Sequence, residues 1–334
     1  MSCTRWALHP LGNKAKFEHP FTDLLAPMCP AVVNELSRGT LVFMLCTRRE
    51  ALCGLIFSAA PALAEYLDIR TIAADLTTPP LTDSEPRPGL RVRQTVPEYS
   101  GTDVHHALYL PVDWRRGRRY PVIVEYAGNG NYRNSYGDVS EGTVEGSNLG
   151  YGISGGKGFL WVCMPFVDQR AKRNATEWWG DPEATVDYCK KAVADVCGRF
   201  GGDPRELILA GFSRGAIACN YIGLREDEIA RLWLAFIPYS HYDGVKTWPY
   251  PDCDRASALS RLERLKGRAQ FIIQENSVEA TRDYLKSTGI QAPFTFVTLP
   301  FRNHNDAWTL RNLPARRMVR SWLKETLRTR PGAA

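Results

Sequence analysis

The residues in this chain best suited to chemistry are a serine between two glycines and the histidines that follow it. Ser213 lies in Gly211-Phe-Ser-Arg-Gly215, which has the form G-x-S-x-G of a nucleophile elbow. A serine hydroxyl is a weak nucleophile at neutral pH, and it is activated by a base that is itself oriented by an acid. The pattern therefore predicts nucleophilic catalysis by Ser213, with the acid and then the histidine following along the chain.

Two histidines follow Ser213, and their positions differ in a way that selects one of them. His304 comes just after the last predicted strand, at 294–299, where the base of such a triad is expected. His241 follows the strand that comes directly after the elbow helix, which is too early for the base. We expect His304 to be the base and His241 to lie at the rim of the pocket.

The acid has two candidates. Glu275 stands at the end of the predicted strand 270–273 and is the favoured choice. Asp243 follows the preceding strand and is the alternative, because some hydrolases take their acid from that loop.

A developing oxyanion needs two backbone N–H donors. We expect one from Arg214, the residue after the nucleophile, and the other from the loop at Gly128-Asn129-Gly130, which follows a strand and lets the backbone approach closely. The bulky side chains expected to line the substrate pocket are Tyr132, Arg133, Trp178 and Trp179.

Apolar runs and helical patterns alternate along the chain and indicate how these residues are positioned. The predicted strands lie at 120–126, 158–165, 207–210, 232–237, 270–273 and 294–299. Their continuous apolar character favours a mostly parallel sheet of α/β class, covered by helices on both faces.

Local signals refine this scheme. Asp181 and Pro182 predict the cap and first residue of a helix that runs to about Phe200. Residues 91–96 and 105–110 have strand character and suggest an opening hairpin or edge. Side chains at positions 211 and 215 would collide with the neighbouring strand and helix, so both positions require glycine.

The first 64 residues differ from the rest. Arg48-Arg49 precede an apolar segment of about 14 residues, too short to span a bilayer, which ends in the A-x-A sequence Ala62-Leu63-Ala64. This is typical of a signal peptide of twin-arginine type. We expect residues 1–43 to be a non-structural leader, 44–64 a signal peptide and 65–334 the catalytic domain of a periplasmic or secreted protein, without a membrane span in its mature form.

The charge and the cysteine pattern argue against nucleic-acid binding and against a metal site. The net charge of +6 is mild and no basic stripe interleaves with aromatic residues, so nucleic-acid binding is not expected. The five cysteines after residue 64 form no C-x-x-C and have no histidine at zinc spacing, so we expect no metal site. We expect free buried thiols, with one or two disulfides as the alternative.

Residues 118 to 326 resemble the α/β-hydrolase superfamily. The segment Gly202-Asp-Pro-Arg-Glu-Leu-Ile-Leu-Ala-Gly-Phe-Ser-Arg-Gly215 is similar to esterases of the dienelactone-hydrolase, feruloyl-esterase and prolyl-oligopeptidase-like groups. The resemblance implies acyl-enzyme chemistry on a small-molecule or carbohydrate-linked ester, without metal or organic cofactor. A serine peptidase, an acyltransferase and a non-catalytic binding protein on a degenerate hydrolase scaffold are the alternatives.

Overall fold

The computed structural model describes residues 66–330 of the 334-residue chain. The expected leader at 1–43 and signal peptide at 44–64 lie outside the described residues, and both stay predictions. Within residues 66–330, no helix is both long and apolar enough to cross a membrane.

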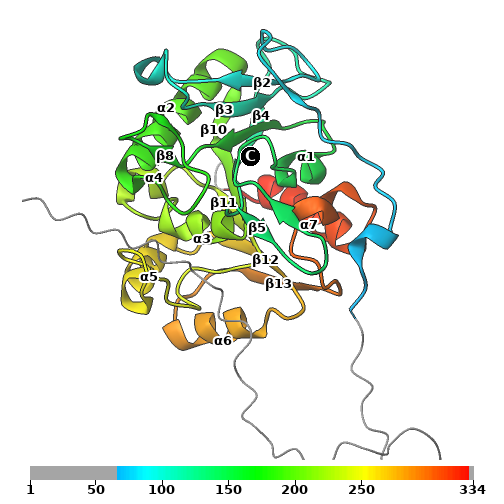
Figure 1. The fold of residues 1–334 in the computed structure, drawn as a ribbon, viewed down its shortest axis with the longest axis vertical. Helices are drawn as coiled ribbons and strands as arrows, with labels where there is room; N and C mark the ends of the chain where they lie inside the picture. The colour runs from blue at the N-terminus through cyan, green and yellow to red at the C-terminus, as the bar shows by residue number, and fades with distance from the viewer. Residues whose placement is uncertain (1–65, 331–334) are drawn as a thin grey trace, which may run out of the picture. The chain divides into compact units, whose positions relative to one another are not determined.

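One sheet forms the centre of the described chain (Figure 1), and its strands run in the order β1-β2-β3-β7-β4-β10-β11-β12-β13. Their bounds are Leu81–Thr82 (β1), Arg91–Gln94 (β2), His106–Tyr109 (β3), Tyr120–Tyr126 (β4), Leu160–Met164 (β7), Gly202–Phe212 (β10), Ala235–Tyr239 (β11), Ala269–Glu275 (β12) and Phe294–Leu299 (β13). All pairings from β7 through β13 are parallel. The antiparallel pair of β2 and β3 confirms the expected opening hairpin.

Helices cover both faces of this sheet (Figure 1). Their bounds are Leu149–Ser154 (α1), Pro182–Phe200 (α2), Arg214–Tyr221 (α3), Asp227–Ala230 (α4), Arg255–Leu262 (α5), Glu279–Thr288 (α6) and Pro314–Arg328 (α7). Residues of α1 and α7 share one apolar cluster, and those of α2 to α6 share the other. The two clusters lie on opposite sides of the strands, so the fold is the expected α/β sandwich.

Short elements complete the fold. Two hairpins join Tyr132–Arg133 (β5) to Val139–Ser140 (β6) and Val167–Asp168 (β8) to Arg173–Asn174 (β9). Short 3₁₀ helices in the described chain are at Ile69–Thr71 (η1), Pro97–Tyr99 (η2), Glu263–Leu265 (η3) and Asp306–Leu310 (η4). The β5–β6 hairpin follows the end of β4, which places it beside the carboxyl edge of the sheet.

Helix α2 shows how local sequence sets an element. The side chain of Asp181 accepts a hydrogen bond from the Ala184 amide at 3.0 Å, and Pro182 is the first helical residue. The helix ends where Gly201 turns into the left-handed region at φ +80°. Both bounds confirm the prediction. The helix is followed directly by β10, the strand that ends just before Ser213.

The five described cysteines after residue 64 are all buried and free of disulfide bonds. The expectation of free thiols is confirmed, and the alternative of disulfides among these five is wrong. Their burial in two packed apolar clusters keeps them away from solvent.

Candidate active site

Ser213 occupies a strained turn between β10 and α3. Its backbone lies at φ +54° and ψ −113°, and its amide donates to the Tyr239 carbonyl at 2.9 Å. A Cβ on Gly211 would lie 2.0 Å from the Gly215 carbonyl oxygen, and one on Gly215 would lie 1.9 Å from the Tyr126 carbonyl oxygen. The collisions expected at both glycines are confirmed, and the turn holds the serine at the carboxyl edge of the sheet.

His304 links Ser213 to a carboxylate. Its Nε2 lies 2.9 Å from Ser213 Oγ, and its Nδ1 lies 2.5 Å from Glu275 Oε1. An ionised carboxylate only accepts hydrogen bonds, so the proton on Nδ1 faces Glu275. Nε2 is then free to accept the proton of the Ser213 hydroxyl, which is the arrangement that nucleophilic catalysis requires.

The charge state of Glu275 fits this arrangement. Burial by itself would raise the pKa of Glu275, but the hydrogen bond and the charge of His304 outweigh it and hold the pKa below its usual value. The second carboxylate oxygen, Oε2, is buried without a hydrogen-bond partner among the described residues. The carboxylate's side-chain contacts are therefore made through the oxygen that faces His304.

Asp243, the alternative acid, is placed elsewhere. Its carboxylate forms a two-point ion pair with Arg261, at 2.9 and 3.1 Å, and both side chains are buried. Since both of its oxygens face a guanidinium, Asp243 is not directed at His304. Of the two candidates, the structure brings only Glu275 to the histidine.

Ser240 joins the same group of side chains, although no sequence pattern pointed to it. Its hydroxyl donates to Glu275 Oε1 at 2.8 Å and lies 2.9 Å from His304 Nδ1. The residue directly follows β11 with φ +87°, a conformation rare for serine. Its position shortly after an apolar strand was visible in the sequence, but its backbone angle was not.

His241 borders the site, as expected. Its ring stands nearly perpendicular to that of His304, with the centroids 5.4 Å apart. Burial, and then the charge of His304, lower the pKa of His241 to about 4. His241 is therefore neutral at pH 7, and it adds no positive charge that would oppose protonation of His304.

Asp138 is a second functional candidate that the sequence analysis missed. It is 3% exposed and lies in the β5–β6 turn, directly before β6. One carboxylate oxygen accepts from Asn303 Nδ2 at 3.0 Å and Asn305 Nδ2 at 2.5 Å, and the other accepts from the His304 amide at 2.8 Å and Asn134 Nδ2 at 2.8 Å. This buried carboxylate thus fastens the backbone of the histidine loop to the hairpin.

The two segments expected to donate to an oxyanion lie next to the elbow. The amide of Arg214 is the first of α3, so it has no acceptor within its own helix. Gly128 packs so closely on Phe212 that a Cβ there would lie 2.8 Å from its ring. The side chain of Asn129 accepts from the Trp178 amide at 2.7 Å, which fixes the Gly128–Gly130 loop against the next segment.

Aromatic rings border this group. Tyr132 packs on His304 with the centroids 4.9 Å apart. Trp178, partly buried at φ +52°, packs on Tyr250 at 4.3 Å and on Trp248 at 5.6 Å. A half-exposed aromatic surface therefore extends from the histidine.

The other two side chains expected in the pocket differ in their surroundings. Trp179 is 3% exposed and stacks on Tyr221 at 4.5 Å, so it belongs to the core and that expectation was wrong. Trp178 and Trp179 are adjacent in sequence, but their side chains point in different directions. Of the two, only Trp178 faces the surface. Arg133 is exposed and pairs with Glu141 at 3.2 Å.

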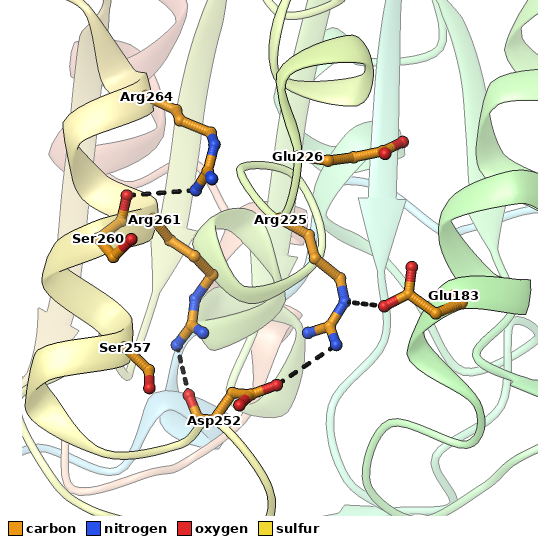
Figure 2. Close-up of a pocket in the computed structure, with 8 residues that line it drawn as sticks. All are labelled: Glu183, Arg225, Glu226, Asp252, Ser257, Ser260, Arg261 and Arg264. Carbon is orange, nitrogen blue, oxygen red and sulfur yellow. Dashed lines mark hydrogen bonds and ion pairs between the residues drawn. The ribbon is translucent and has the colours of Figure 1, made fainter.

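A separate open pocket has a volume of about 370 Å³. Its lining side chains are mostly charged (Figure 2). Its lining residues are Glu183, Arg225, Glu226, Asp252, Ser257, Ser260, Arg261 and Arg264. All three arginines already contact carboxylates: Arg225 pairs with Glu183 and Asp252, and Arg261 and Arg264 pair with Asp243 and Asp227. None of its residues belongs to the group around Ser213, and its charges compensate one another.

No group of three or more histidine, cysteine or acidic side chains in residues 66–330 is placed to hold a metal ion. The side chains around Ser213 make a hydrogen-bonded series, Ser213–His304–Glu275, that ends on a carboxylate. The chemistry this arrangement can perform is proton transfer from a hydroxyl followed by nucleophilic attack.

Comparison with known proteins gave solved structures only. No family model and no curated protein matches the chain. A thermostable esterase shares 16% identity and a TM-score of 0.45, over 71% of this chain and 62% of its own. A puromycin hydrolase shares 13% identity and a TM-score of 0.49, over 71% and 40%. A feruloyl esterase module from Clostridium thermocellum, solved with sinapinate, shares 12% identity and a TM-score of 0.45, over 75% and 94%.

The chain spans less than two thirds of the length of the first two of these structures. These low identities and TM-scores below 0.5 leave the substrate open. The assignment of the fold rests on the molecule itself: a mostly parallel nine-stranded sheet with helices on both faces, and a strand–serine–helix elbow on one of its inner strands. The described chain has the α/β-hydrolase fold.

Proposed function

We propose that this protein is a serine hydrolase that cleaves carboxylic esters through an acyl-enzyme intermediate. One observation carries the proposal: Ser213 Oγ, the His304 ring and Glu275 Oε1 form an unbroken series of contacts at 2.9 and 2.5 Å. The order of these residues along the chain, serine, acid and histidine, is that of the α/β-hydrolase triad.

In the proposed reaction each of these residues has one step. His304 Nε2 takes the Ser213 proton as Oγ bonds to the ester carbonyl carbon, and the carbonyl electron pair moves to its oxygen. The amides of Arg214 and of the Gly128-Asn129 segment donate to that oxyanion. When the carbonyl re-forms, the ester C–O bond breaks and His304 returns the proton to the departing alcohol. Water then repeats the sequence to release the acid and restore Ser213.

Glu275 acts by charge. It stays ionised and stabilises the imidazolium that forms when His304 holds the proton. The position of Glu275 also supports an enzyme over a binding protein on a degenerate scaffold, because both contacts of His304 have catalytic geometry. We propose small-molecule or carbohydrate-linked esters as substrates.

Covalent labelling tests the proposal. Purified wild-type protein should react with a fluorophosphonate probe at one site and should hydrolyse short aryl esters. Ser213→Ala should lose both reactions. Ser260→Ala, which changes an exposed serine on α5, is the matched control and should keep both. A folded wild type that never labels would favour the binding protein instead.

Ester, peptide and acceptor substrates should then be compared. Faster turnover of peptides, or transfer of the acyl group to an acceptor alcohol in preference to water, would favour the peptidase or the acyltransferase.

We also propose that the protein is exported, with its signal peptide ending near Ala64. The A-x-A sequence and the preceding arginine pair motivate this proposal. Amino-terminal sequencing of protein from the native host should find a mature chain that begins near Glu65. A mature chain that still carries residues 1–43 would refute it.

A further inference from the structure

The side chain of Arg214 is buried beside the nucleophile in an unusual environment. It is 2% exposed, and within residues 66–330 its guanidinium donates to carbonyl oxygens and pairs with no carboxylate. Its hydrogen bonds go to carbonyl oxygens: Nη1 donates to Trp178 at 2.6 Å and, more weakly, to Ala175 at 3.5 Å, and Nη2 donates to Gly142 at 3.2 Å. The guanidinium also lies 4.1 Å from the centre of the Phe166 ring.

A buried charge without a counter-ion lowers the stability of the fold, so we expect Arg214 to have a role that offsets this cost. Burial lowers the pKa of Arg214 to about 9, in keeping with a cation that no adjacent carboxylate neutralises. The planar guanidinium presents five donors in a fixed fork, so one arginine can hold several acceptors at once. The carbonyls that Arg214 holds therefore indicate its role.

Those carbonyls belong to segments that hold the Gly128–Gly130 loop. The amide of Trp178, whose carbonyl Arg214 binds, donates to Asn129 Oδ1 at 2.7 Å. The amide of Gly130 donates to the Thr176 carbonyl at 2.7 Å. Segment 175–178 is thus tied to the loop on one side and to the guanidinium on the other.

Gly142, the third acceptor, is in direct contact with the same loop. A Cβ on Gly142 would lie 2.6 Å from the Gly130 nitrogen and 1.9 Å from the Thr176 carbonyl oxygen. Gly142 has φ +72°, so glycine suits both its backbone and its packing. Three segments therefore meet at Gly130, and Arg214 binds two of them.

We propose that Arg214 builds both halves of the oxyanion hole: its backbone N–H is one donor, and its side chain is a positioning group that holds the loop carrying the other. This inference rests on the proposed function. It explains why a costly buried cation stands directly after the nucleophile, since from there one residue reaches both halves.

The strained backbone of Trp178 depends on this arrangement. At φ +52° the residue is unfavourable by itself, and its amide and carbonyl are held by Asn129 and Arg214. Without the guanidinium, the carbonyl loses its donor and Trp178 can relax toward a negative φ. Its amide then leaves Asn129, and the loop loses its fixed position.

Kinetics of Arg214→Met, Arg214→Lys and a control test the proposal. Arg268→Met is the control, because Arg268 also donates to carbonyls, including that of Leu265 at 2.7 Å, and packs 5.5 Å from the Phe236 ring. Burial lowers its pKa too, but it lies beside the amino end of β12, away from Ser213.

We expect Arg214→Met to lower kcat for an aryl ester roughly 100-fold, the effect of losing one oxyanion donor, with little change in KM. An aryl boronic acid, which imitates the tetrahedral intermediate, should bind more weakly by a similar factor. Arg214→Lys should fall between, because an ammonium cannot hold both carbonyls in a fork. Arg268→Met should lose stability and keep kcat. A folded Arg214→Met protein with kcat within threefold of wild type, or an equal loss in Arg268→Met, would overturn the proposal.

Hydrogen exchange of residues 127–131 tests the positioning role without any activity. We expect at least tenfold faster exchange of these amides in Arg214→Met than in wild type or Arg268→Met. Unchanged exchange there would overturn the proposal. Failure of the wild type to react with a fluorophosphonate would instead refute the proposed function, and the exchange rates would still decide whether Arg214 holds the loop.

Discussion

Replacing each of two carboxylates by its amide should separate catalysis from stability in this protein. Glu275 is the last residue of β12 and Asp243 follows the neighbouring strand β11, so both acidic side chains lie near the carboxyl edge of the sheet. Glu275 contacts His304, whereas Asp243 contacts Arg261. We predict that Glu275→Gln loses activity and stays folded, and that Asp243→Asn loses stability and stays active.

The expected loss for Glu275→Gln follows from its contacts. Removing the charge of a triad acid lowers kcat by about 10⁴-fold in serine proteases. Here Ser240 Oγ also lies 2.9 Å from His304 Nδ1 and can keep the ring oriented. We therefore expect a smaller loss, about 10²–10³-fold, which corresponds to about 3–4 kcal/mol of transition-state stabilisation.

The expected loss for Asp243→Asn is of a different kind. Arg261 is 5% exposed, and breaking such a buried pair costs about 3–5 kcal/mol. The guanidinium also donates to the Asp252 carbonyl at 2.8 Å, which favours the lower end, about 3 kcal/mol. For a domain of this size that lowers Tm by about 6–12 °C.

Steady-state kinetics at 20 °C and thermal unfolding of both variants provide the test. An Asp243→Asn protein that is folded at 20 °C and has lost kcat 100-fold, beside a Glu275→Gln protein that keeps kcat, would refute the assignment of the acid. Both substitutions preserve the size of the side chain, so a cavity cannot account for either result.

Three further predictions concern the parts around this pair. Asp138→Asn should lower kcat more than tenfold and the free energy of unfolding by about 2 kcal/mol, because one of its two acceptor oxygens becomes an NH2 group that faces N–H donors and the support of the His304 loop is weakened; unchanged kinetics would contradict this. Gly215→Ala should cost about 3 kcal/mol in urea unfolding through its collision with the Tyr126 carbonyl, whereas Gly198→Ala, exposed within α2 with open space, should gain up to about 1 kcal/mol. The pKa of Glu275 is depressed in the folded state, so its ionised form adds stability above the unfolded pKa near 4.5, and this is lost as pH falls through the lower folded value. The difference in Tm between wild type and Glu275→Gln should therefore shrink below pH 4.5, and a difference that grows there would show the sign to be wrong.

Much of the fold could be predicted because strands buried on both faces are continuously apolar. The strands at 120–126 and 294–299 and the helix from Pro182 to Phe200 have the predicted bounds. The elbow could also be predicted from the sequence, because its two glycines are required. A Cβ atom at either position would lie 2.0 Å or less from the backbone of a neighbouring segment. Each of these features depends on residues within one short stretch of the chain, so that stretch alone predicts it.

The acid and the residues that hold the site could not be predicted in the same way. Parallel strands bring both Glu275 and Asp243 to one edge, so spacing alone does not separate them, and the choice depends on Arg261, which lies on a later helix. Asp138 is far from His304 along the chain and has no motif of its own. Trp178 and Trp179 are adjacent in sequence, and only packing shows that one faces the surface and the other the core.

Backbone strain is concentrated around Ser213. Eight described residues other than glycine have positive φ, and five of them, Asn131, Trp178, Ser213, Ser240 and Asn276, belong to the site or its loops. Glycine adopts positive φ without steric cost, whereas the conformation costs about 1–3 kcal/mol in other residues and least in asparagine. Selection for thermal stability alone should therefore replace the residues at these positions first. Efforts to make the protein more heat-resistant should leave these five residues unchanged and alter the helices and the opening strands instead, because relieving strain at the proposed active site is expected to lower activity.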